Sequence, residues 1–164
     1  MELTKRGRCL LTTKIVFGVL GAVSGISIFV SFSYYNNWHA AAWGLLSAIF
    51  AIMVLRLHIF RRRNTLHLRY NAETMRIAKQ CGIFTSLISF IAAITYFVLA
   101  YTINHGYQLE NDGYMPAGIF ALMTLKWTVM LFLAGKKYEE FLSSPEQQEF
   151  AYTNTSNQAY SRQI

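Results

Sequence analysis

Long stretches of this 164-residue chain lack charged residues. Asp, Glu, Lys and Arg are absent from residues 15–55 and 80–109, and residues 113–135 contain only one of them, Lys126. A soluble domain of this size needs charged side chains in such stretches to cover its surface, whereas a lipid environment requires none. The absence therefore excludes a soluble fold and predicts an all-α integral membrane protein.

Cysteines and catalytic motifs are scarce as well. Cys9 and Cys81 are the two cysteines, and no Cys-x-x-Cys or Cys/His spacing occurs, so neither a disulfide framework nor a zinc site is expected. The sequence contains no paired carboxylates, Ser/His/Asp spacing or glycine-rich phosphate loop, so we do not expect an enzyme. The net charge of +7 does not indicate nucleic-acid binding, because the basic residues lie directly beside apolar segments.

Apolar segments long enough to cross a bilayer divide the chain. The sequence predicts four transmembrane helices, at about residues 15–33, 40–60, 81–101 and 115–133. Together they form one domain, residues 1–141, and the polar segment 142–164 is expected to be a disordered tail. Gly21 and Gly25 form a small-xxx-small pair, which lets another helix approach closely, either within the chain or in a second copy.

The positions of Lys and Arg predict the orientation of these helices. Four lie before the first span, seven from Arg56 through Lys79, and three after the fourth span. The other two connections, at about residues 34–39 and 102–114, contain none. Because loops rich in Lys and Arg remain on the cytosolic side, both the N-terminus and the C-terminus are predicted to be cytosolic.

Lys126 is predicted to lie near the middle of the fourth span. A lysine at that depth costs about 2.5–3.5 kcal/mol on insertion scales, and such a residue is by default a candidate for function. At 100° per residue, Lys137, Met123 and Met130 fall on the same face of the helix. This face could bind a ligand with a polar head group. The alternative is that Lys126 extends toward the membrane surface or bonds a neighbouring carbonyl.

Histidines at both membrane faces are candidate ligand-binding residues. His58 lies near the end of the second span, beside Arg56 and residues 61–63. A neutral imidazole is a common ligand of haem iron, and guanidinium groups pair with carboxylates such as propionates. Alternatively, this segment is a basic helix end without a ligand. His105 and His39 lie in the two predicted exoplasmic loops, where each could capture a ligand or be an ordinary interfacial residue.

Several short motifs occur in an order that resembles a known family. They are Val54-Leu55-Arg56-Leu57-His58, Val98-Leu99-Ala100 followed by His105, Leu125-Lys126-Trp127, and Lys136-Lys137-Tyr138 followed by Phe141. From about residue 15 to residue 141, the chain resembles the haem-responsive-gene family of eukaryotic four-span haem transporters. One motif departs from the family, because Ala134 and Gly135 stand where it has an aromatic residue and an alanine.

The resemblance implies a transporter that moves haem from the exoplasmic or organelle-lumen side into the cytosol. It implies residence in an endosomal or lysosomal membrane or in the plasma membrane, and haem as the transported ligand. The expected haem-binding residues are His58, His105, Lys126, Lys136, Lys137 and Tyr138, of which the two histidines would ligate the iron. Four short helices can hardly enclose a flat macrocycle alone, so we expect a homodimer or higher oligomer.

Other interpretations are weaker. One alternative is a membrane enzyme similar to the microsomal glutathione transferases. Only His67, Asn71 and Glu73 resemble the motif of those enzymes, and their spacing does not fit it. A tetraspan interaction protein that does not transport is another alternative. The segment from Tyr138 to Phe141 also fits the tyrosine-x-x-bulky pattern read by endocytic sorting machinery, and it fits a simple helix end equally well.

Overall fold

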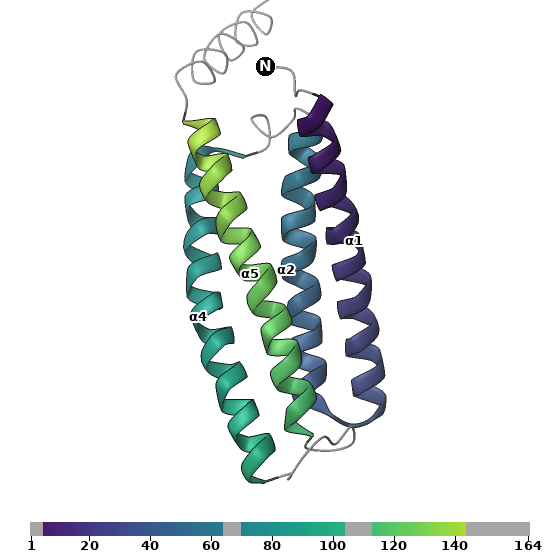
Figure 1. Cartoon of the computed structure of the whole chain (residues 1–164). Helices are drawn as coiled ribbons and strands as arrows, with labels where there is room; N and C mark the ends of the chain where they lie inside the picture. Colours follow the sequence, from purple (N-terminus) through teal and green to yellow (C-terminus); the bar gives the residue numbers. More distant parts are fainter. Residues whose placement is uncertain (1–4, 64–69, 104–112, 144–164) are drawn as a thin grey trace, which may run out of the picture.

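The computed structural model describes residues 5–63, 70–103 and 113–143. Within these ranges the chain forms four α-helices, drawn in Figure 1: α1 (Lys5–Tyr34), α2 (Trp38–Arg62), α4 (Ala72–Thr102) and α5 (Tyr114–Leu142). All four are long and apolar enough to cross a membrane. The all-α architecture predicted from the sequence is therefore confirmed.

The helices extend beyond the predicted apolar spans where polar sequence adjoins them. Helix α4 begins at Ala72, within the polar connection that precedes the third predicted span and for which a short interfacial helix is the most that the sequence indicates, and it continues without a break into that span. Met75 in this first part is fully buried, in one hydrophobic cluster with Leu131 and Tyr138 of α5. Packing against a neighbouring helix thus stabilises a helical turn that hydropathy alone does not mark.

Helices α2 and α5 form the centre of the molecule. Helix α1 packs against α2, α2 against α5, and α5 against α4, so the outer helices are α1 and α4 (Figure 1). In the most apolar 18-residue stretch of each helix, the buried share is 50% in α2 and 44% in α5. The corresponding share is only 17% in α1 and 17% in α4. The large apolar side chains exposed on the outer helices are consistent with contact to lipid.

Small residues allow the helices to approach closely. A Cβ placed on Gly25 of α1 would lie 2.9 Å from the Cβ of Ala48 in α2, and one on Gly21 would overlap the Trp127 ring of α5. Gly82 of α4 similarly lies against the backbone of Phe132 in α5. Because lipid supplies no hydrophobic force between helices, such close contacts stabilise the bundle. The Gly21–Gly25 pair therefore packs within the chain.

Buried Asn37 connects the turn after α1 to the start of α5. Its side-chain oxygen accepts a hydrogen bond from the backbone N–H of Ala40 and caps α2. Its amide also donates to the carbonyl of Gly113, at a distance of 3.0 Å. Residues Tyr34 to Trp38, Thr102 and Tyr114 thus share one end of the bundle, called here the aromatic end; the opposite end, with Lys14, Arg61 and Lys137, is called the basic end.

Candidate functional site

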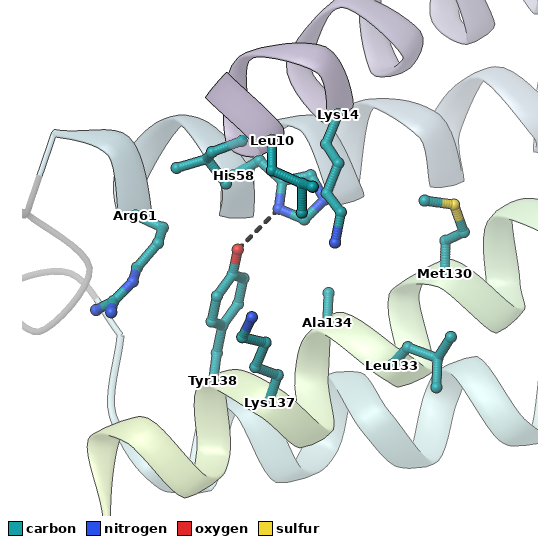
Figure 2. A pocket seen from close by; sticks show the side chains of 10 residues that line it. Leu10, Lys14, His58, Arg61, Met130, Leu133, Ala134, Lys137 and Tyr138 are labelled. Atoms are coloured by element: carbon teal, nitrogen blue, oxygen red, sulfur yellow. Dashed lines mark hydrogen bonds between the residues drawn. The ribbon is translucent and has the colours of Figure 1, made fainter. Parts of the chain in front are cut away.

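A cavity of about 310 Å³ lies at the basic end, between α1, α2 and α5. This volume is near the lower limit of about 300–1,000 Å³ found for ligand pockets. Figure 2 shows side chains from all three helices directed toward this space. The lining residues are Leu10, Leu11 and Lys14 of α1, His58 and Arg61 of α2, and Met130, Leu133, Ala134, Lys137 and Tyr138 of α5.

The helical repeat explains why these residues meet. Leu10 and Lys14 are four residues apart on α1, and Met130 and Lys137 are seven apart on α5, so each pair lies on one face of its helix. Helices α1 and α2 form an antiparallel hairpin, which places the beginning of α1 beside the end of α2. Because α5 ends at the same end of the bundle, its last turns close the third side.

His58 and Tyr138 form a buried hydrogen bond across this cavity. The two residues are separated by 80 positions in the sequence, and the distance from His58 Nδ1 to the Tyr138 hydroxyl oxygen is 2.8 Å. Each residue is only 4% exposed. The ring planes are nearly perpendicular, at 82°. A buried imidazole requires a hydrogen-bond partner, and this one holds the His58 ring in a fixed orientation with its second nitrogen, Nε2, available for another ligand.

Positive charge and apolar surface share the cavity. Figure 2 shows the amines of Lys14 and Lys137 directed toward the space in front of His58, with Arg61 at one side. Leucine, methionine and alanine side chains form the remaining wall, and none of the described residues that line the cavity is acidic. Such a lining suits an amphipathic anion, whose carboxylates pair with the cations while its apolar body contacts the hydrocarbon side chains.

The predicted lysines do not share one site. Lys137 lines the cavity, but Lys136 lies on the other side of α5, beside a second depression of about 470 Å³ together with the Lys79–Glu139 ion pair. Lys126 is exposed and does not line the cavity, and its Nζ lies 5.3 Å from the centre of the neighbouring Trp127 ring. The three lysines predicted to bind the propionates thus lie at three different places on the bundle.

Some predictions fall on segments outside the described residues. These include His105, His67 and nearly all of the predicted tail, residues 144–164. Within the described ranges, no group of three His, Cys, Asp or Glu residues could hold a free metal ion. The sorting interpretation of Tyr138 does not fit the structure, because its hydroxyl is buried against His58 and a sorting signal must be accessible.

Lys14 and the partnership of His58 with Tyr138 were missed by sequence reasoning. Lys14 was counted only as one of the charges that orient the first helix, and Arg61 only as part of a basic helix end. A signal existed: Lys14 is the last charge before the first span, and Arg61 begins the run that ends the second. The two helices are antiparallel neighbours, so these two positions must lie at the same membrane depth.

Comparison with known proteins supports the resemblance seen in the sequence. The model of a family described as "Haem-transporter, endosomal/lysosomal, haem-responsive gene" matches residues 75–127, which include most of α4 and the first half of α5. The protein "Heme transporter hrg-1" of Caenorhabditis elegans is 28% identical over 137 residues, covering 80% of this chain and 69% of the worm protein. No solved structure matches the chain. The chain is thus similar to the haem-responsive-gene family of haem transporters, and this similarity points to a transporter rather than an enzyme.

Proposed function

We propose that this protein carries haem across a membrane into the cytosol. The observation that carries the proposal is the cavity at the basic end, where the buried His58 lies among three cationic side chains and an apolar wall. The family match supports haem as the substrate, although His58 and Tyr138 lie outside the matched residues 75–127. The proposed role of the cavity therefore rests on its chemistry.

In this proposal His58 is the ligand of the haem iron. With the proton on Nδ1, His58 donates to the hydroxyl oxygen of Tyr138, and Nε2 keeps the lone pair that iron requires. Metal-binding histidines are commonly oriented by a hydrogen bond at the other ring nitrogen. Tyr138 is thus a positioning residue here, and not a direct ligand of haem as the sequence had suggested.

Lys14 and Lys137 are the proposed partners of the two propionates. They extend into the same cavity from opposite helices, α1 and α5, whereas Lys136 lies elsewhere. We expect Lys14→Gln and Lys137→Gln each to weaken haem binding about 5- to 10-fold, since a charge-assisted hydrogen bond contributes roughly 1–1.5 kcal/mol in a partly hydrated site. Haem dimethyl ester lacks the carboxylates, so its affinity should not change in either variant.

The test of the site is a haem titration of the purified protein, followed through the Soret band. His58→Ala should lower haem affinity and change the band because the iron loses its axial ligand, and it should reduce haem uptake. His67→Ala is the matched control, since this histidine lies in a predicted cytosolic loop. Equal Soret spectra and equal uptake for both variants and the parent would exclude His58 as the iron ligand.

The proposed direction of transport follows from the charges of the basic end. Lys14, Arg61, Arg62 and Lys137 lie there, whereas the described part of the aromatic end contains no Lys or Arg. Basic loops remain cytosolic, so both termini would face the cytosol and the cavity would be the exit side. The family description supports an endosomal or lysosomal membrane, and the plasma membrane is the second location that we propose.

Assembly of two or more copies is also part of the proposal. Lys126 is exposed on a face of α5 that it shares with exposed Leu122, Met123 and Val129. A lysine near mid-bilayer is rarely left facing lipid. A second copy covering this face would remove Lys126 from lipid. Light scattering of the detergent-purified protein should give at least twice the chain mass of 18.8 kDa, and a monomeric mass would exclude this arrangement.

A further inference from the structure

A second histidine lies among aromatic rings at the aromatic end. His39 is in the first turn of α2, and its Nδ1 is 3.3 Å from the hydroxyl oxygen of Tyr96 in α4. The His39 ring centre lies 5.7 Å from that of Tyr96 and 5.8 Å from that of Tyr114 in α5. Trp43, one helical turn further along α2, contacts Tyr96 edge-on. Side chains from three helices therefore converge on one imidazole.

This cluster differs from an ordinary interfacial aromatic belt. Tyr34, Trp38 and Tyr101 belong to such a belt, since they are 86%, 63% and 83% exposed. Tyr96 and Tyr114 are instead half-buried and stack on each other, with ring planes 24° apart. The Tyr96 hydroxyl faces Nδ1 of the histidine, and the Tyr114 ring is tilted by 47° to the imidazole, which itself remains exposed. The arrangement combines an accessible nitrogen base with a fixed aromatic surface.

The two described histidines have the same kind of partner. His58 and His39 each bond through Nδ1 to a tyrosine hydroxyl on another helix, and within the described residues neither Nε2 has a hydrogen-bond partner. They are nineteen residues apart on α2, which at a rise of about 1.5 Å per residue is roughly 28 Å. This distance is close to the hydrocarbon thickness of about 30 Å. One helix thus places an oriented imidazole near each membrane face.

We propose that His39, Tyr96 and Tyr114 form a second haem site, on the opposite side of the membrane from the cavity. The proposal rests on the proposed function, because it takes haem as the ligand. Nε2 of His39 would ligate the iron, Tyr96 would orient the ring, and Tyr114 would offer its ring to the porphyrin. His39 then receives haem on the entry side and His58 receives it on the exit side.

Single-histidine variants test this site. Because the chain contains four histidines, replacing His58, His67 and His105 by Gln leaves His39 alone, and replacing His39, His67 and His105 leaves His58 alone. The purified variants are titrated with ferric haem in detergent, with the Soret band as readout. We expect both to bind one haem with a histidine-ligated spectrum. A variant without histidine should show only the spectrum of free haem.

Two comparisons make the test specific. In the variant that retains only His39, Tyr96→Phe should weaken haem binding at least 10-fold, because His39 loses its orienting bond. Tyr101→Phe on the same helix is the control and should have no effect, since that side chain is exposed. In the otherwise unchanged chain, His39→Gln should reduce the bound haem from two to one per chain.

The outcomes separate this proposal from the proposed function. If the His58-only variant binds haem and the His39-only variant does not, the second site is refuted and the cavity stands. If His39→Gln leaves the number of bound haems unchanged, the second site is likewise refuted. Failure of the His58-only variant to bind would refute the cavity as a haem site, and binding by the His39-only variant would then still support His39.

Discussion

Replacing Tyr138 by phenylalanine removes one oxygen atom and with it the hydrogen bond to His58. Both residues are 4% exposed, so bulk water has little access to the imidazole nitrogen that loses its partner. An unsatisfied buried group costs about 1–3 kcal/mol, which should lower the melting temperature of the purified protein. Loss of an orienting bond to a metal ligand typically costs 10–100-fold in affinity, or roughly 1.4–2.7 kcal/mol, so haem binding should weaken by that amount.

A double-mutant cycle tests whether the two residues act together. The variants are His58→Ala, Tyr138→Phe and their combination, and the measured quantity is haem affinity by Soret titration. Because Tyr138 acts through His58, adding Tyr138→Phe to His58→Ala should change affinity little, giving a coupling energy of roughly 1.4–2.7 kcal/mol, equal to the loss in the single variant. Tyr101→Phe, exposed at the other end, is the control. Fully additive losses would show that Tyr138 contacts haem independently of His58 and would refute its positioning role.

Three further predictions concern topology, the fourth span and packing. In a background in which Cys9 and Cys81 are replaced by serine, Tyr34→Cys should react with an impermeant thiol reagent added on the exoplasmic side, whereas Arg63→Cys should not. The reverse labelling pattern would show that the orientation is opposite to the predicted one. Lys126→Met should leave the abundance of the protein and haem binding at the cavity unchanged but reduce haem uptake, and Lys126→Arg should retain part of the uptake. Normal haem uptake by a well-expressed Lys126→Met variant would exclude a role for this lysine in transport. Gly25→Val should lower the melting temperature because the added carbons overlap Ala48, whereas Val23→Leu on the exposed face of α1 should leave it unchanged. Equal melting temperatures for the two variants would contradict the close packing of α1 and α2.

The helices could be predicted from the sequence because hydropathy and charge are local properties. Residues 15–55 lack charge and contain one polar turn, so two spans and a short connection were the natural interpretation. The first turns of α4 were expected at most as a short interfacial helix, and not as a continuous part of the third span. Their stability depends on Met75, which is buried against α5, and a contact between distant segments leaves no periodic signal in such a short stretch.

The candidate site could be predicted only in part, and for a similar reason. His58, Lys137 and Tyr138 were expected to bind haem, and the structure places all three at one cavity. Lys14 was missed because its closeness to His58 depends on which faces of α1 and α2 meet. That contact is decided by glycines such as Gly25, whose position allows close approach but does not specify the partner helix or the register.

The central pair of helices is what makes a transport function physically reasonable. Helix α2 carries His39 at one end and His58 at the other, and α5 supplies Tyr114 to the first and Tyr138 to the second. Both imidazoles therefore extend from the most buried helix, and each is oriented by a tyrosine hydroxyl of another helix. If the two imidazoles ligate iron as proposed, an orientation fixed in this way would let them bind without first being ordered, which favours capture of a scarce ligand. The outer helices complete both places, since α4 supplies Tyr96 beside His39 and α1 supplies Lys14 beside His58, so a movement of either outer helix would change the surroundings of the imidazole that it contacts.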